Sequence, residues 1–351
     1  MFELYATWAT LPILMARIGR RPASWRAMCW LAVSLVAILC ALQDATTNKD
    51  REVYAFLIDA IKDDDTFSME PGFYLIVKLL GVALSGPELN AAFFFVVAAL
   101  SMAIKLRLFK RYGGSIFGCL AAFFSYFFLL HEVTQVRTGL AIAFLYLSWF
   151  AFAEGRKRDF WLYGIAAMMF HYSCVLFVIA PFLFFPDGRR KFTVTVAIAA
   201  LLAAASALQG SAVLGGLELL AGAVGVDRLG VYFQLLQEGV LADITPLRLV
   251  PHTLLLIAAA CTQRRWRRDR LTFFLVQIYV YGLLLFIILS PIPALAYRVS
   301  DLFLFAGVFL LGRMRSYSPR NVYYPLVVAY TAVFVVYTIQ FSGLFVLPSA
   351  N

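Results

Sequence analysis

The sequence predicts an all-α, polytopic integral membrane protein with roughly 10–12 membrane-embedded helices, some of them re-entrant or broken. Two observations support this fold class. Of the 351 residues, 62% are hydrophobic and only 14% are charged, whereas about 25% of the residues in a soluble domain are charged. Apolar runs close to the roughly 20 residues that a helix needs to cross a bilayer recur from end to end. These runs are continuous rather than alternating, which excludes a transmembrane barrel.

Because the apolar runs cover the whole chain, residues 1–351 are expected to form a single transmembrane domain without a separate soluble part. The N-terminus lacks both the basic region and the cleavage site of a signal peptide, so we expect a short first span or an interfacial helix there. The predicted spans lie near Ala27–Leu42, Ala91–Leu108, Ser115–Leu130, Gly139–Ala153, Phe192–Leu208, Arg248–Thr262, Leu271–Leu289, Leu295–Leu311 and Val322–Ile339.

Clusters of Lys and Arg beside the spans predict which ends face the cytoplasm. They are Arg17/Arg20/Arg21/Arg26, Lys105/Arg107/Lys110/Arg111, Arg156/Lys157/Arg158, Arg264–Arg270 and Arg313/Arg315/Arg320. Placing all of them on one side accounts for the net charge of +10 without a nucleic-acid partner. It also makes residues 44–70 and 209–245 extracytoplasmic loops with amphipathic or re-entrant elements.

Two segments do not fit a simple alternation of full crossings. Phe73–Ser85 is short and carries Lys78, which predicts a half-inserted or re-entrant segment. Phe160–Phe185 is followed by the basic residues 189–191, which predicts a broken helix that turns back near His171. The alternative is that residues 189–191 lie outside, against the charge rule. Discontinuous helices at membrane depth usually border a cavity.

Polar residues between two strong spans, in the stretch 130–141, are the first candidates for chemistry. On a continuous helix Glu132, Gln135 and Gly139 would share one face. Arg137 enters a membrane segment, which costs several kcal/mol unless the guanidinium is paired or lines water. One interpretation is a snorkelling interfacial arginine. The other is an anion clamp, because a guanidinium binds phosphate oxygens in a bidentate manner.

A histidine inside an apolar segment, His171, is either a satisfied core residue or a general base, since imidazole titrates near neutral pH. Glu70 precedes a Pro-Gly pair that begins a membrane-dipping helix, and the positive end of that helix favours an ionised carboxylate. Arg298 and Asp301 are three residues apart, close enough to pair along a helix.

A metal centre is not expected. Two further histidines lie at span ends, and the five cysteines show no metal-ligand spacing, so they are interpreted as core residues. These positions are His131, His252, Cys29, Cys40, Cys119, Cys174 and Cys261.

Several short motifs occur together in an order that resembles the EpsG-type, Wzy-like exopolysaccharide and O-antigen repeat-unit polymerases. A "D…Y" pair is met by Asp50 and Tyr54, and "EP-G-F" by residues 70–73. A "Q-[IV]-R-Q-G-[LI]-A" motif is met by residues 135–141, with Thr138 in place of the second glutamine. An "[LM]-x-F-H-x-S" motif is met by residues 168–173, and a late "R-x-S" by residues 298–300.

The resemblance implies a metal-independent membrane glycosyltransferase without a cofactor, in the bacterial cytoplasmic (inner) membrane. It would polymerise undecaprenyl-diphosphate-linked oligosaccharide repeat units on the outer face, with lipid-linked donor and acceptor as substrates. A flippase and a chain-length regulator of the same pathway are the expected partners. The alternatives are a membrane O-acyltransferase, an O-antigen-ligase-like transferase, and a lipid-linked glycan flippase or transporter.

The same resemblance, joined to the residue chemistry, assigns the site. Arg137 and Arg298 are expected to clamp the diphosphate, and His171 to act as general base with Glu70 or Asp50 in reserve. Tyr54 is expected to stack on a sugar ring. Three further residues complete the expected substrate contacts, namely Gln135, Glu132 and Asp301.

Overall fold

A computed structural model of the chain describes residues 22–43, 50–63, 69–184, 192–198, 200–201 and 246–340. The expected loop 209–245 and the basic residues 189–191 lie outside the described residues. Two compact units make up the structure. Unit 1 comprises residues 1–180 and 308–351, and unit 2 comprises residues 181–307.

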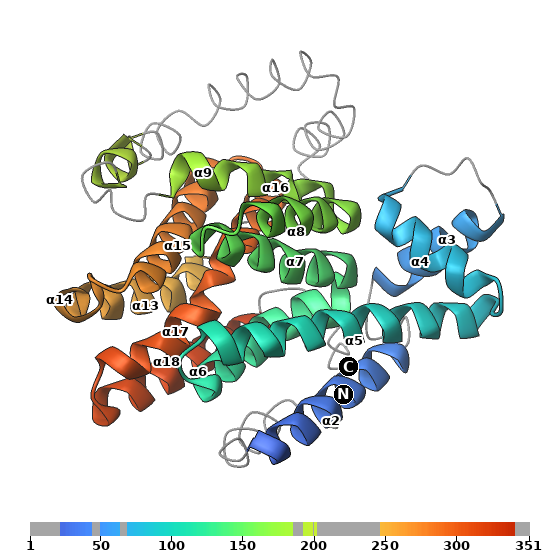
Figure 1. Ribbon diagram of the computed structural model, residues 1–351, viewed down its shortest axis with the longest axis horizontal. Coiled ribbons are helices and arrows are strands. Elements are labelled where there is room, and N and C mark those ends of the chain that lie inside the picture. The colour runs from blue at the N-terminus through green and yellow to red at the C-terminus, as the bar shows by residue number, and fades with distance from the viewer. Residues whose placement is uncertain are drawn as a thin grey trace, which may run out of the picture. The chain divides into compact units, whose positions relative to one another are not determined.

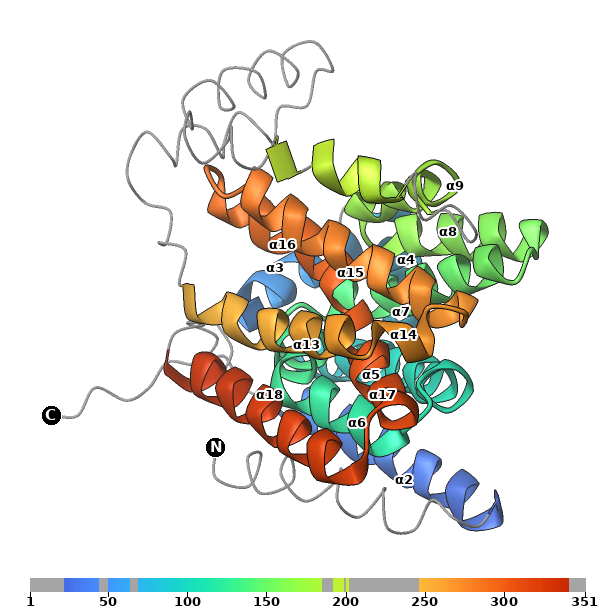
Figure 2. The same cartoon turned by 90° about the vertical axis from the view of Figure 1, so that its left-hand side faces the viewer.

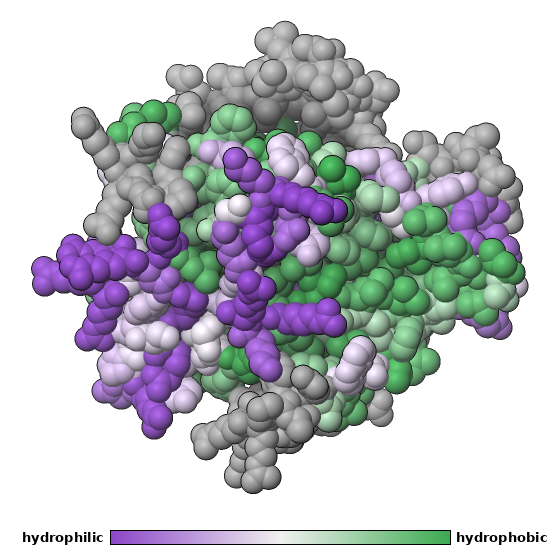
Figure 3. Space-filling view, viewed as in Figure 1, coloured by the Kyte–Doolittle hydropathy of each residue, from purple (hydrophilic) through white to green (hydrophobic). Residues whose placement is uncertain are grey.

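The described residues form helices that confirm an all-α, polytopic membrane protein. Six helices are long and apolar enough to cross a membrane: Gly86–Tyr112, Ile116–Thr134, Val136–Ala153, Arg270–Ile288, Leu295–Tyr317 and Arg320–Gln340. Shorter apolar helices cover Cys29–Ala41, Pro71–Gly81, Tyr172–Phe182 and Leu249–Cys261. Apolar side chains cover much of the surface in Figure 3, as expected where lipid replaces water.

Unit 1 is built around a 27-residue helix, α5 (Gly86–Tyr112), along which α2 (Pro22–Ala41) packs (Figure 1). Two short helices, α3 (Asp50–Asp63) and α4 (Pro71–Gly81), pack against α5. Then follow α6 (Ile116–Ala122), the π-helix η1 (Phe123–Thr134), α7 (Val136–Ala153), α8 (Lys157–Phe170) and the 3-10 helix η2 (Tyr172–Ile179). Gly155, with a φ of 75°, makes the tight turn between α7 and α8.

The C-terminal part of unit 1 returns to pack against α6 and η1. It contains α18 (Arg320–Gln340) and most of α17 (Ala306–Tyr317). In Figure 2 α18 runs beside α6. The rings of Phe334 on α18 and Tyr126 on η1 stack with centroids 5.1 Å apart. The hydroxyl of Thr338 also donates to the Ser125 carbonyl at 3.3 Å. Long-range contacts of this kind hold the unit together.

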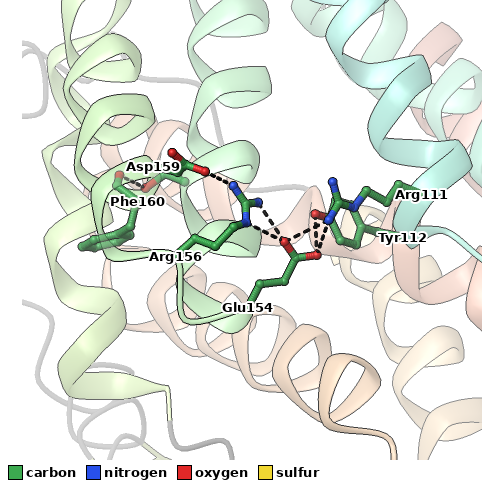
Figure 4. A network of polar contacts seen from close by, with 7 residues as sticks. Arg111, Tyr112, Glu154, Arg156, Asp159 and Phe160 are labelled. Carbon is green, nitrogen blue, oxygen red and sulfur yellow. Dashed lines mark hydrogen bonds and ion pairs between the residues drawn. The ribbon is translucent and has the colours of Figure 1, made fainter.

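Basic clusters that are far apart in the sequence meet at one end of unit 1. Arg111 and Arg156 both bind the Glu154 carboxylate, and Arg156 also pairs with Asp159 (Figure 4). Arg313 Nη1 donates to the Tyr112 carbonyl at 3.1 Å. The term "basic end" is used below for this end of unit 1, defined by the C-terminus of α5, the α7–α8 turn and Arg313. The arrangement is what a common cytoplasmic side requires.

The two segments that break the alternation of spans are short helices in the structure. The 11-residue α4 is about 16 Å long, half of the roughly 30 Å hydrocarbon core. Helix α8 ends at Phe170, and the extended backbone of His171 (φ −157°, ψ 116°) separates it from η2. Phe177 then packs back on Phe160 and Trp161, with ring centroids 5.3 and 5.5 Å apart. The chain therefore reverses at His171, as predicted.

Unit 2 contains η3 (Pro246–Arg248), α13 (Leu249–Cys261), α14 (Gln263–Trp266), α15 (Arg270–Ile288) and α16 (Pro293–Leu304). Asp269 caps α15, because its carboxylate accepts from the backbone N–H groups of Leu271 and Thr272. A Cβ at Gly282 would lie 2.8 Å from that of Phe303, so this glycine permits the close packing of α15 on α16.

Candidate functional site

An arginine at the start of α7 occupies the centre of the candidate site. Arg137 lies in the first turn after Gln135, whose backbone (φ −99°, ψ 60°) separates η1 from α7. Its Nη1 donates to Glu70 Oε2 at 2.6 Å, and its Nε donates to the Tyr54 hydroxyl at 3.3 Å. The Arg137 side chain is 22% exposed and that of Glu70 is 5% exposed. This is a paired, inward-facing guanidinium rather than a snorkelling one.

Tyr54 has a different place from the one expected. Its ring is 5% exposed and packs against Phe73, Phe93 and Phe94, with centroids 6.1, 6.4 and 5.4 Å away. A ring enclosed in this way has no free face for a sugar, so the expectation of stacking was wrong. Burial raises the pKa of the Tyr54 hydroxyl despite the nearby Arg137. The neutral hydroxyl therefore holds the guanidinium of Arg137 in place.

Glu70 joins Arg137 to His171. It occupies the N-cap position of α4, ahead of Pro71, without a capping side-chain hydrogen bond, and its Oε1 lies 3.9 Å from His171 Nδ1. Burial acts to raise the pKa of the Glu70 carboxyl, but His171 and the positive charge of Arg137 outweigh it and hold that pKa below its ordinary value. Glu70 is therefore ionised at neutral pH. Such a carboxylate is better suited to orient its two neighbours than to remove a proton.

Two glycines from the motifs allow the helices to approach at this site. A Cβ at Gly72 would lie 2.8 Å from the carbonyl oxygen of Met169 and 2.9 Å from the ring of Phe170. This contact sets α4, and with it Glu70, against the end of α8. A Cβ at Gly139 would lie 2.3 Å from the carbonyl oxygen of His131. That contact packs the first turns of α7 against the end of η1.

Glu132 lies elsewhere in unit 1. Its carboxylate pairs with Lys105, and both side chains are fully buried. The Ser101 hydroxyl also donates to Glu132 Oε1, at 3.1 Å. Glu132 and Gly139 belong to two helices that meet at Gln135 rather than to one continuous helix, yet a Cβ at Gly139 would lie 3.3 Å from Glu132 Oε1. Among the described residues Glu132 forms no hydrogen bond or ion pair with Arg137, and its role as a substrate contact stays a prediction.

Lys105 is the residue whose position the sequence interpretation missed. It was assigned to a cytoplasmic basic cluster, yet it is fully buried on α5. The sequence did contain a sign of this burial, because Lys105 lies inside the predicted span Ala91–Leu108.

Two other expected site residues lie near Arg137 in the sequence or the fold. Asp50 begins α3, one turn before Tyr54, and adds a negative charge close to the Tyr54 hydroxyl. Gln135 is half-buried at the junction of η1 and α7.

The late motif lies in unit 2. Asp301 pairs with Arg248 rather than with Arg298, so the expected pair along α16 was wrong. Arg248 is 1% exposed, and its guanidinium carbon lies 4.4 Å from the Tyr297 ring centroid and 5.2 Å from that of Phe286. Arg298 is exposed on α16. Because Arg298 belongs to unit 2 and Arg137 to unit 1, their joint action stays a prediction.

Comparison with known proteins adds one finding. The sequence profile of the EpsG family matches residues 26–350, nearly the whole chain. No curated protein and no solved structure matches the chain.

Proposed function

The chain belongs to the EpsG family, and from that premise we propose that it polymerises lipid-linked oligosaccharide repeat units. Family membership places this multi-pass membrane protein in exopolysaccharide biosynthesis. The proposal goes further, to a glycosyltransferase of the bacterial cytoplasmic membrane that uses undecaprenyl-diphosphate-linked donor and acceptor. The single observation that supports it best is the Arg137–Glu70–His171 cluster.

In the proposed reaction an acceptor hydroxyl attacks the anomeric carbon of the donor glycan. His171 takes the hydroxyl proton, and a new C–O bond forms. The bond between the anomeric carbon and the diphosphate oxygen breaks, and its electron pair leaves with undecaprenyl diphosphate. Arg137 stabilises the negative charge that develops on this leaving group. The Glu70 carboxylate stabilises the imidazolium of His171 through Nδ1, which leaves Nε2 for the acceptor.

The contacts of Arg137 fit this role. Nε and Nη1 are used by Tyr54, Glu70 and the Met69 sulfur. Nη2 makes no hydrogen bond to another described residue and is free to bind a phosphate oxygen. Partial exposure of Arg137 and His171, at 22% and 17% of their side chains, leaves room for a ligand.

The location of the cluster also supports the proposal. Arg137 lies at the start of α7, and the α7–α8 turn of the basic end follows its last residue. Helix α7 is 18 residues long. That length corresponds to about 27 Å, close to the thickness of the hydrocarbon core. If the basic end is cytoplasmic, Arg137 lies at the opposite membrane face. Lipid-linked repeat units would meet it there. Arg298 is proposed as a second diphosphate contact.

The test is in vitro polymerisation of purified lipid-linked repeat units by the full-length protein. We expect Arg137→Ala and His171→Ala each to lower the elongation rate by about 10²–10³-fold. Arg111→Ala is the matched control, because it removes an arginine from a Glu pair at the basic end and should retain near wild-type elongation. Elongation at the wild-type rate by both site variants would refute the assignment.

The products separate the remaining alternatives. Longer glycan on the same lipid supports a polymerase. Transfer to a different lipid without elongation would indicate a ligase-like enzyme, and acylated glycan an acyltransferase. Movement of lipid-linked sugar across vesicles without a new glycosidic bond would indicate a flippase.

A further inference from the structure

We propose that unit 1 carries a binding site for an anionic phospholipid between α2 and α5, separate from the glycan site. A cavity of about 330 Å³ lies between these helices. It is lined by Cys29, Trp30, Val33, Ala103, Leu106, Arg107 and Lys110. The lining thus combines an apolar wall with two cations, and no acidic side chain lines it among the described residues.

The positions of these residues match the two parts of a phospholipid. Arg107 and Lys110 are three residues apart on α5, so they lie on one face of the helix. Both are exposed, and together they place two positive charges at one end of the cavity. Ala103 and Leu106 lie one turn farther from the end of α5, and Val33 faces them from α2. An acyl chain that follows this apolar wall runs toward the membrane interior.

The cavity lies at the depth where a lipid headgroup belongs. Lys110 is next to Arg111, the residue that joins the ion-pair network of the basic end in Figure 4. Basic sites between transmembrane helices on the cytoplasmic side are suited to anionic headgroups. Trp30 is 66% exposed, and indole rings are enriched at the interface between membrane and water.

A free anion would contact the two cations of this cavity but not its apolar wall. Arg107 and Lys110 are exposed to solvent, so an inorganic phosphate bound there would be strongly screened by salt. The apolar wall adds affinity only for a ligand with a hydrocarbon chain. The chemistry of the lining therefore favours an anionic phospholipid of the surrounding bilayer over a soluble anion.

The first test measures thermal stability of the full-length protein in detergent with added lipid. Phosphatidylglycerol should raise the melting temperature more than phosphatidylcholine does, and inorganic phosphate alone should have no effect. The phosphatidylglycerol-specific increase should fall by more than half in an Arg107→Gln/Lys110→Gln variant. An Arg264→Gln/Arg265→Gln variant carries the same charge change on exposed residues of α14 and should keep it. Equal stabilisation by both lipids, or equal loss in both variants, would overturn the proposal.

A second test locates the lipid and does not depend on stability. Brominated phosphatidylglycerol should quench tryptophan fluorescence of the wild type more than brominated phosphatidylcholine does. Trp30→Phe should remove that difference, since Trp30 lines the cavity. If the difference persists in Trp30→Phe, the lipid binds elsewhere. If the two brominated lipids quench the wild type equally, the cavity either has no preference for an anionic lipid or holds another occupant. In both cases the proposal fails.

Discussion

Two of the arginine–glutamate pairs in unit 1 lie in opposite settings. At the basic end Arg111 binds Glu154 at 2.9 Å, with side chains 62% and 30% exposed. At the start of α7 Arg137 binds Glu70 at 2.6 Å, with side chains 22% and 5% exposed. An exposed pair contributes little, about 0–1 kcal/mol, because water and salt screen it. In the more buried pair each charge loses most of its contact with water and is stabilised mainly by its partner. The positions of Arg137 and Glu70 are therefore held more tightly, as a catalytic site requires.

A third acid–base pair extends the comparison to full burial. Lys105 and Glu132 are both completely buried, and the Ser101 hydroxyl also donates to the Glu132 carboxylate. Removing one partner of a buried pair leaves an uncompensated charge, whereas removing both leaves none. The three pairs therefore form a series in which the effect of losing one partner should increase with burial.

The largest effect is expected for the fully buried pair. Lys105→Met or Glu132→Leu alone should destabilise the protein by about 3–5 kcal/mol. The double variant Lys105→Met/Glu132→Leu should recover most of that loss, because both charges are gone. Reversible unfolding in mixed micelles measures all three variants. A double variant as unstable as the sum of the single ones would show that the pair acts through packing rather than charge.

A smaller effect, with a distinct pH dependence, is expected for Glu70→Gln. The variant keeps the shape of the side chain but loses its charge, so Arg137 and His171 lose their orienting partner. Elongation should fall about tenfold. Because the pKa of Glu70 is lowered in the folded protein, its charge stabilises that state at neutral pH. This contribution is lost as pH falls through the folded pKa.

Melting temperatures of wild type and Glu70→Gln across pH check this sign. The difference between them should be largest near neutral pH and should shrink as the pH falls below the ordinary pKa of a glutamate and through the lowered pKa of the folded protein. A difference that stays constant with pH would mean that the Glu70 charge does not stabilise the fold. Glu154→Gln is the matched control at the basic end and should change melting by less at every pH.

The smallest effect is expected for Tyr54→Phe. The substitution removes only the hydroxyl that accepts from Arg137 Nε and keeps the ring in its aromatic cluster. A single hydrogen bond to a charged group contributes about 1.5–3 kcal/mol, but Glu70 still holds Nη1. Elongation should therefore fall by less than about tenfold, chiefly through the rate constant rather than substrate affinity. Loss of substrate affinity alone, with an unchanged rate constant, would contradict this positioning role of Tyr54.

The sequence by itself determined the fold class and the residues most suited to chemistry. Apolar runs of membrane-crossing length predicted the helical bundle, since a bilayer leaves few other ways to satisfy the backbone. The basic residues 189–191, which follow the apolar run Phe160–Phe185, predicted the break that the structure shows at His171. The motifs pointed to Arg137, Glu70 and His171, which the structure brings together from the ends of three helices.

The tertiary structure decided which charged side chains form ion pairs with one another. Sequence spacing suggested that Asp301 pairs with Arg298 and that Lys105 faces the cytoplasm, but Asp301 binds Arg248 and Lys105 binds Glu132. Spacing describes only neighbours along one helix, whereas a buried charge must find its partner wherever the packing of helices provides one. For the same reason only the fold could show that Tyr54 is enclosed by aromatic rings and holds Arg137 in place.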